Sequence, residues 1–289
     1  LDYGLNGTVH TLAWASEAQG GRLFAGGDFS AVSLPSGVDS SQHTSAVAEW
    51  DGTRWHALDQ GLDGKVRTLA WVDDSSATTG GQLYAGGEFN KAGDLTVNHV
   101  ARWDGQHWNA LRTAGDTESG VDGLVTAVAW DKSTSRLLIG GDFDHAGDHD
   151  AEYLVAWKDE QWTELNAPAV PTLLISTAND ANATHALFAV TNENFNDLEI
   201  LLPPPGLMGY SVVTLEGATW APLTSAHPVN GEIHALAWQP NAEGEEGNLY
   251  IGGQFTQIGS VAARRVARWD GNLWHPLSRG SLNGVSGTV

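Results

Sequence analysis

Short hydrophobic runs alternate along this chain with glycine-rich and polar segments, and helical periodicity is missing throughout. One stretch shows the pattern in full: the runs are VRTLAWV from Val66 to Val72, QLYAGGEF from Gln82 to Phe89, HVARWD from His99 to Asp104, and HWNAL from His107 to Leu111. Hydrophobic runs of this length, bounded by turn residues, are typical of β-strands. The pattern therefore predicts units of four short strands in an all-β protein.

The four-strand pattern repeats along the chain. Its marker is a Gly-x-x-Gly segment before the first strand, which is clear at Gly4 to Val9, Gly61 to Val66, Gly120 to Val125 and Gly284 to Val289, and weaker before Val170 and Ile233. Four-stranded units repeated in this way are typical of β-propellers. We expect a single domain over 1–289, a β-propeller of five four-stranded blades, with a part of a six- or seven-bladed propeller as the alternative. The expected repeats are 9–65, 66–124, 125–169, 170–232 and 233–288.

Each unit also carries glycines and tryptophans at fixed places. Double glycines occur at Gly26-Gly27, Gly86-Gly87, Gly140-Gly141 and Gly252-Gly253, and Trp-Asp pairs at Trp50-Asp51, Trp103-Asp104 and Trp269-Asp270. A later tryptophan follows at Trp55, Trp108, Trp162, Trp220 and Trp274. This order resembles the kelch repeat of the galactose-oxidase type of propeller, which usually has Tyr-Asp in place of Trp-Asp. The resemblance implies the fold but no single function, because such propellers include enzymes, lectin-like binders and scaffolds.

The fourth unit departs from this order, with Ala189-Val190-Thr191 in place of the double glycine and Leu215-Glu216 in place of Trp-Asp. The ends of the chain fall inside the repeat, since Leu1 to Leu5 aligns with Leu58 to Leu62 and Val289 opens a further unit. We therefore expect the segment to be excised from a longer polypeptide with flanking domains.

All thirteen tryptophans occupy one of three repeat positions. None is left for a site specific to one unit, and an indole buries a large area when it packs between sheets. The tryptophans are therefore interpreted as packing residues rather than as a platform for sugars. The Asp-Gly pairs that precede the fourth strands predict tight turns, because such turns need positive φ.

Composition narrows the range of partners. The chain has 35 acidic and 14 basic residues, a net charge of −21, and no cysteine. Such a surface repels phosphate groups, so nucleic acid and anionic lipid are excluded as general partners. No apolar run approaches the roughly 18 residues that span a bilayer, so membrane insertion is not expected. The absence of cysteine rules out the copper chemistry of galactose oxidase, which needs a tyrosine cross-linked to cysteine.

The first strands argue against polysaccharide hydrolysis. Propeller enzymes usually draw their acids from the innermost strands, and glycosidases need a pair of carboxylates facing the sugar. None of the five first strands carries a carboxylate within its body, and the nearest is Asp131 at the end of the third. No nucleophile elbow, phosphate-binding loop or dinucleotide fingerprint is present either.

Two groups of polar residues remain as candidate sites. The second residue of each first strand varies, as His10, Arg67, Thr126, Pro171 and His234. In a closed five-bladed ring His234, His10 and Arg67 are consecutive, and these three donors are predicted to hold an anion such as a ligand carboxylate. The alternative is that they are solvated side chains at strand starts.

The second group lies after the third double glycine. Acidic or amide residues follow each double glycine, as Asp28, Glu88, Asp142 and Gln254, and the third loop is the richest. There Asp142, Asp144, Asp148 and Asp150 are predicted as calcium ligands, with His145 and His149 available for a transition metal. The ligand order of an EF-hand loop is not met, because its fifth position is Ala146. A solvated acidic loop is therefore the alternative.

These observations predict a non-catalytic binding or scaffold domain of a secreted or cell-surface protein, with a protein or glycan partner. No bound cofactor is expected apart from the calcium considered above. The binding segments are expected in the variable loops between second and third strands, which are Ser30 to Ser45, Asn90 to Asn98, Asp144 to Glu152, Asn194 to Gly209 and Thr256 to Arg264. The alternative function is a polysaccharide-active hydrolase or lyase with a site in the channel.

Overall fold

The structure is a computed structural model, and it describes residues 4–15, 21–30, 45–73, 80–177, 186–191, 210–216, 219–223, 229–240, 247–279 and 282–285. Within these ranges the chain forms strands, turns and bends, and no helix. The chain divides into two compact units. Unit 1 comprises Leu1–Trp130 and Leu137–Asn166, and unit 2 comprises Asp131–Arg136 and Ala167–Val289.

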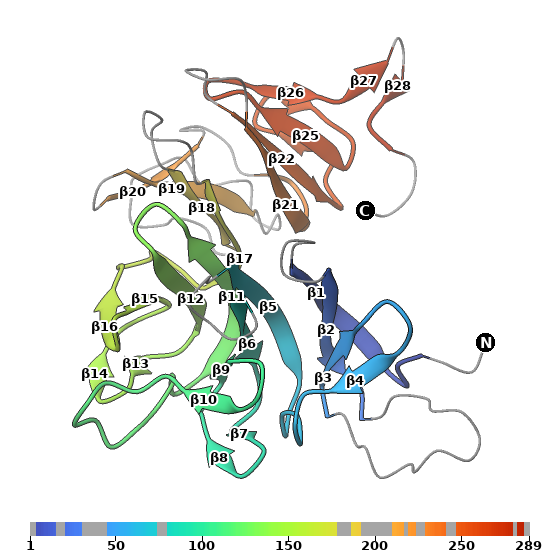
Figure 1. The fold of residues 1–289 in the computed structure, drawn as a ribbon. Coiled ribbons are helices and arrows are strands. Elements are labelled where there is room, and N and C mark those ends of the chain that lie inside the picture. Colours follow the sequence, from blue (N-terminus) through green and yellow to red (C-terminus); the bar gives the residue numbers. More distant parts are fainter. Residues whose placement is uncertain are drawn as a thin grey trace. The chain divides into compact units, whose positions relative to one another are not determined.

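Unit 1 contains three four-stranded antiparallel sheets, which we call blades 1 to 3 (Figure 1). Each blade comes from one repeat, and its four strands lie side by side in sequence order. Blade 1 consists of β1 (Thr8–Ala15), β2 (Arg22–Asp28), β3 (Val47–Trp50) and β4 (Trp55–Ala57). Blade 2 consists of β5 (Val66–Asp73), β6 (Gly81–Gly87), β9 (Val100–Trp103) and β10 (Trp108–Ala110). Blade 3 consists of β11 (Leu124–Asp131), β12 (Arg136–Asp142), β15 (Leu154–Lys158) and β16 (Gln161–Glu164).

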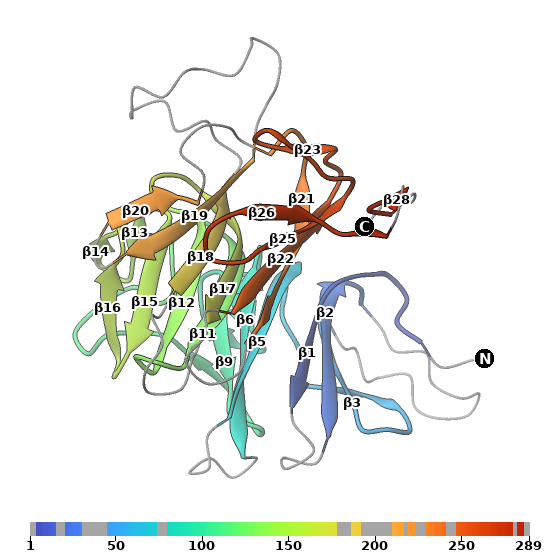
Figure 2. The same ribbon diagram turned by 90° about the horizontal axis from the view of Figure 1, so that it is seen from above.

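Unit 2 contains two further sheets of the same kind, blades 4 and 5 (Figure 2). Blade 4 consists of β17 (Pro171–Thr177), β18 (Ala186–Thr191), β19 (Ser211–Glu216) and β20 (Thr219–Pro222). Blade 5 consists of β21 (Ile233–Gln239), β22 (Asn248–Gly253), β25 (Val266–Trp269) and β26 (Trp274–Pro276), and a hairpin of β27 (Ser278–Arg279) and β28 (Leu282–Asn283) follows it. These five sheets confirm the predicted fold class, an all-β propeller with five four-stranded blades.

The double glycines stand opposite a register shift at the start of the first strand. In blade 1, Val9 pairs with Gly27 and Thr11 with Gly26, so His10 is the extra residue of a bulge. Blades 2 and 5 show the same shift. At the second glycine of the pair an added Cβ would stand 1.9 to 2.0 Å from a backbone carbonyl oxygen of the first strand or its preceding residue, in blades 1, 2, 3 and 5. The doubled glycine is therefore explained by this close approach of two backbones.

In blade 4 the strand register corrects the predicted alignment by one residue. Thr172 is left out of the ladder, because its neighbours Pro171 and Leu173 pair with Thr191 and Val190. Thr172, and not Pro171, is therefore the counterpart of the second residue of the other first strands. Val190 and Thr191 stand where the other blades have their double glycine. The Val-Pro pair caused the error, because it resembles the valine-led start of the other first strands.

The Asp-Gly pairs form the predicted turns before the fourth strands. Gly52, Gly105 and Gly271 have φ between 96° and 98°, a conformation that glycine adopts without a steric penalty. In the first of these turns, Oδ1 of Asp51 accepts hydrogen bonds from the amides of Thr53 and Arg54 at 2.8 and 2.9 Å.

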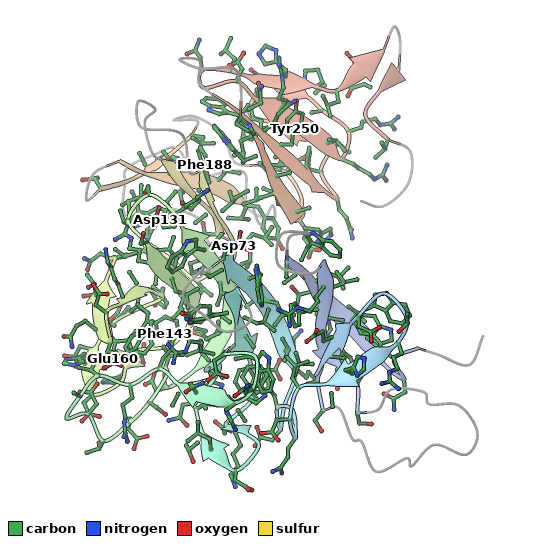
Figure 3. All side chains as sticks on the ribbon, viewed as in Figure 1. Asp73, Asp131, Phe143, Glu160, Phe188 and Tyr250 are labelled. Atoms are coloured by element: carbon green, nitrogen blue, oxygen red, sulfur yellow. The ribbon has the colours of Figure 1, made fainter. Side chains whose placement is uncertain are left out.

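Many of the tryptophans pack against another aromatic ring, either within one blade or on the neighbouring blade. Two tryptophans meet across the third and fourth strands of blades 1, 2, 3 and 5, with ring centroids 4.4 to 5.5 Å apart. Trp71 of blade 2 stacks on Phe24 of blade 1 with centroids 5.3 Å apart. In unit 2, Trp238 of blade 5 lies 5.7 Å from Phe188 of blade 4, which is labelled in Figure 3. Trp14 differs from the others, since it is 55% exposed.

Candidate functional site

An Asn or Asp side chain inside the Gly-x-x-Gly marker holds the segment that follows the second strand of the same blade. In blade 2, Oδ1 of Asp63 accepts hydrogen bonds from the amides of Asn90 and Lys91, both at 2.8 Å. Asp122 and Asn230 accept the corresponding pairs of bonds, and Asn6 accepts one from Ser30. The marker is therefore a structural clamp in blades 1, 2, 3 and 5, and it positions the edge at which their second strands end.

The segments between second and third strands are regular in blades 2, 3 and 5. They form two-stranded hairpins: β7 (Lys91–Ala92) with β8 (Leu95–Thr96), β13 (His145–Ala146) with β14 (His149–Asp150), and β23 (Gln257–Ile258) with β24 (Val261–Ala262). Their turns share a glycine with φ of 57° or 58°, at Gly93, Gly147 and Gly259. The three segments therefore share one hairpin geometry, and their role in binding a partner stays a prediction.

The sequence did carry a signal for these hairpins. Starting at Phe89, Phe143 and Phe255, it reads FNKAGD, FDHAGD and FTQIGS, a short repeat shared by the three blades. The other two predicted loops, Ser30 to Ser45 and Asn194 to Gly209, lie outside the described residues except for Ser30 and Ser45.

The four aspartates predicted as calcium ligands, Asp142, Asp144, Asp148 and Asp150, are not brought together. Among the described residues, no three acidic or histidine side chains are placed so that they could hold a metal ion. Asp148 instead accepts hydrogen bonds from the amides of Thr117 and Glu118 at 2.9 and 3.0 Å, which lower the pKa of its carboxyl. Asp148 is thus engaged with the segment before blade 3, and calcium binding by the four aspartates stays a prediction.

The two histidines of this hairpin pair with carboxylates. His145 lies between Oδ2 of Asp122, 2.8 Å from its Nδ1, and Oδ1 of Asp150, 3.3 Å from its Nε2. The hydrogen bond to Asp122 raises the pKa of His145, and the negative charges around the imidazole add to this effect. His149 lies 3.5 Å from Asp116 on the connection before blade 3. The histidines therefore fasten the hairpin to neighbouring segments.

The residues predicted to hold an anion lie at the bulges of three first strands. Arg67 donates two hydrogen bonds to Oε1 of Glu88, one of them from Nε at 2.8 Å. His234 lies 3.6 Å from a carboxylate oxygen of Glu232, and His10 is exposed on β1. His10 and Arg67 belong to unit 1 and His234 to unit 2, and their convergence on one anion stays a prediction.

A cavity opens in unit 1 where the end of β2 meets the marker before β5. It has a volume of about 500 Å³ and is open to solvent. Its charged lining residues are Asp28, Asp63, Lys65 and Glu88, and the ammonium of Lys65 lies 3.5 Å from Oδ2 of Asp28. The other lining residues are Asn6, Phe29, Ser30, Ser45, Ala46, Leu62 and Gly64.

Sequence reasoning noted Asp28 and Glu88 as acids after double glycines but found neither the cavity nor Lys65. The cavity is formed by residues from two successive repeats, so its position depends on how blades 1 and 2 pack. The available signal was the single lysine among the markers, where the third repeat has Leu124 and the fifth has Glu232.

Six carboxyl groups in the described residues have a clearly shifted pKa. Those with a clear shift all have the pKa lowered, and they are Asp51, Asp104, Asp122, Asp131, Asp148 and Asp270. Burial raises the pKa of Asp104, Asp122 and Asp131, but the hydrogen bonds that these carboxylates accept outweigh it. The shifted carboxylates thus serve as hydrogen-bond acceptors in turns and clamps.

No protein-family model matches the chain, and no curated protein does. Among solved structures, it is similar to the GH74 enzyme of Niastella koreensis, with 15% sequence identity and a TM-score of 0.47. The match covers 92% of this chain and 38% of that enzyme. This similarity says nothing about the activity of the present chain.

Proposed function

We propose that this chain is a non-catalytic binding domain, a kelch-like propeller of a secreted or cell-surface protein. It binds a protein or glycan partner at the edge of unit 1 where the second strands of blades 1 and 2 end. The observation that carries this proposal is the open cavity lined by Asp28, Asp63, Lys65 and Glu88. Its volume of about 500 Å³ lies within the range of pockets that bind small molecules.

Two carboxylates of the cavity are paired with basic side chains. Glu88 accepts hydrogen bonds from Arg67, and Asp28 lies beside Lys65. A glycosidase needs two carboxyl groups whose surroundings push their pKa values apart, one of them upward. Among the described residues the clear carboxyl shifts are all downward, so the hydrolase or lyase alternative gains no support from them.

The charge of the chain supports a partner that is not anionic. With 35 acidic residues against 14 basic ones, the surface repels polyanions and attracts cations over distances of a Debye length. In the described part of the chain, no helix is long and apolar enough to cross a membrane. A secreted or cell-surface location is part of the proposal and rests on the acidic composition and the four lysines of the sequence.

The proposal is tested by a screen of the whole chain against a glycan array and a displayed peptide library, with a parallel assay for release of sugars from acidic and neutral polysaccharides. The Asp28→Asn/Glu88→Gln variant should lose the selected binding. The matched variant Asp142→Asn changes the equivalent residue of blade 3, outside the cavity, and should keep it. Turnover of a polysaccharide, or binding that neither variant alters, would contradict the proposal.

A further inference from the structure

The cavity in unit 1 has an uneven charge. Three of its lining residues, Asp28, Asp63 and Glu88, carry a carboxylate, and one, Lys65, carries an ammonium. All four side chains reach solvent, with Asp28 57% and Glu88 38% exposed. A cation entering the cavity therefore meets more negative than positive charge.

Lys65 already supplies one cationic group to the cavity. Its ammonium lies 3.5 Å from Asp28, and both side chains are about half exposed. An exposed pair of this kind contributes only about 0–1 kcal/mol. A stronger donor can therefore displace Lys65 from Asp28. The equivalent position of blade 3 is Leu124, so the repeat tolerates a neutral side chain there.

The other two carboxylates keep acceptor capacity. Arg67 uses one oxygen of Glu88, and the amides of Asn90 and Lys91 use one oxygen of Asp63. A carboxylate has about four acceptor positions on two oxygens. Each group can thus accept a further hydrogen bond from a ligand while its present bonds are kept.

The lining does not favour a sugar. Its one aromatic residue, Phe29, is 6% exposed and offers no ring face for a pyranose to stack on. A guanidinium or ammonium group needs no such platform, because both bind carboxylates through charge-assisted hydrogen bonds, the guanidinium by a planar fork of N–H donors and the ammonium as a compact charge.

We propose that this cavity receives a positively charged side chain, an arginine or a lysine, from a protein partner. The inference rests on the proposed function and names the ligand class of the same site. The charged side chain lies among Asp28, Asp63 and Glu88 and displaces Lys65 from Asp28. The negative charge of the whole chain speeds the encounter and makes it sensitive to salt.

The test is a nuclear magnetic resonance titration of the whole ¹⁵N-labelled chain with three probes: acetyl-arginine amide, its neutral analogue acetyl-citrulline amide, and methyl glucoside. The arginine probe should shift the amide signals of Ser30, Ser45 and Gly64 in a saturable way that weakens with added salt. The citrulline and glucoside probes should leave these signals in place.

Variants make the test specific. Asp28→Asn should weaken the binding of the arginine probe by about two- to fivefold, which corresponds to the loss of an exposed ion pair. Lys65→Leu should strengthen the binding of the same probe by about the same factor. Asp142→Asn is the control and should change nothing. Equal weakening by Asp28→Asn and Lys65→Leu would overturn the competition between Lys65 and the ligand.

The outcomes separate this inference from the function on which it rests. If the glucoside shifts the cavity signals and the arginine probe does not, the ligand class is wrong but the binding edge stands. If no probe shifts them while a screened partner still binds in a manner that depends on Asp28 and Glu88, the inference fails and the proposed function stands. If no partner binds in that manner, both fail.

Discussion

The carboxylate of Asp131 accepts a hydrogen bond from the hydroxyl of Ser176 at 3.2 Å, which joins the β11–β12 turn to β17 within unit 2. Ser133, Thr134 and Arg136 also donate to this carboxylate, so both of its oxygens are used (Figure 3 labels Asp131). Burial raises the pKa of Asp131, but these donors together lower it to about 2. Sequence reasoning singled out Asp131 as the one acid near a first strand, and its role is structural.

Replacing Asp131 by alanine should destabilise the chain. The change leaves Arg136, Ser133, Thr134 and Ser176 without their shared acceptor, and breaking a buried charged network costs about 3 kcal/mol or more. Unfolding by urea, followed by tryptophan fluorescence, measures the loss. Asp94→Ala, at an exposed hairpin turn, should change the free energy of unfolding by less than about 0.5 kcal/mol. Equal effects of the two variants would show that the Asp131 network contributes nothing.

The β13–β14 hairpin should loosen as the pH rises. The pKa of His145 is raised above 6.5 in the folded chain, so the protonated imidazole stabilises the hairpin below pH 6.5 and this stabilisation is lost as the pH rises through the raised pKa. Amide hydrogen exchange at His145 to Asp150, corrected for the intrinsic effect of pH, measures the change.

The control for this prediction is His145→Gln, which copies Gln257 at the equivalent position of β23. In this variant the corrected hydrogen exchange of the hairpin amides should no longer change as the pH rises above 6.5. The same dependence in wild type and variant would mean that another group controls the hairpin.

Gly87→Ala should be far more harmful than Gly52→Ala. A Cβ on Gly87 would stand 2.0 Å from the carbonyl oxygen of Lys65, which forces two backbones apart at a cost of about 3 kcal/mol. A Cβ on Gly52 would meet nothing within 4 Å, and its φ of 96° alone costs about 1 kcal/mol. Denaturant midpoints of the two variants measure the difference, and similar losses would contradict the explanation of the double glycine.

Calcium should leave the melting temperature unchanged. The hairpin uses Asp148 to hold Thr117 and Glu118, and the described carboxylates do not converge on one point. Melting in excess calcium and in chelator measures the effect. A rise of several degrees with calcium would show that the loop rearranges and would restore the four predicted aspartate ligands.

The sequence predicted the blades because their signals are local. The short hydrophobic runs, the double glycines and the Asp-Gly turns each act within one repeat, and the strands form at those signals. The alignment of blade 4 failed at Pro171, since the register of a bulge depends on which residues pair across strands and not on which residues resemble each other.

The candidate site was harder to predict. Asp142 to Asp150 looked like a ligand loop because spacing alone does not show that Gly147 turns the segment into a hairpin. The cavity at Asp28 and Lys65 needs two repeats packed together, which is a tertiary property. The hairpin repeat at Phe89, Phe143 and Phe255 could have been predicted, since its sequence signal is plain once the repeats are aligned.

The chain is proposed to bind its partner at the edge formed by the ends of β2 and β6 and the marker between blades 1 and 2. Hydrogen exchange of the whole chain, alone and saturated with the partner selected by the screen, tests it most directly. The amides of Phe29, Ser30, Ala46 and Gly64 should exchange more slowly in the complex, with those of the equivalent edge at Phe143 unchanged. Protection elsewhere in the chain, with the amides at the cavity unaffected, would contradict it.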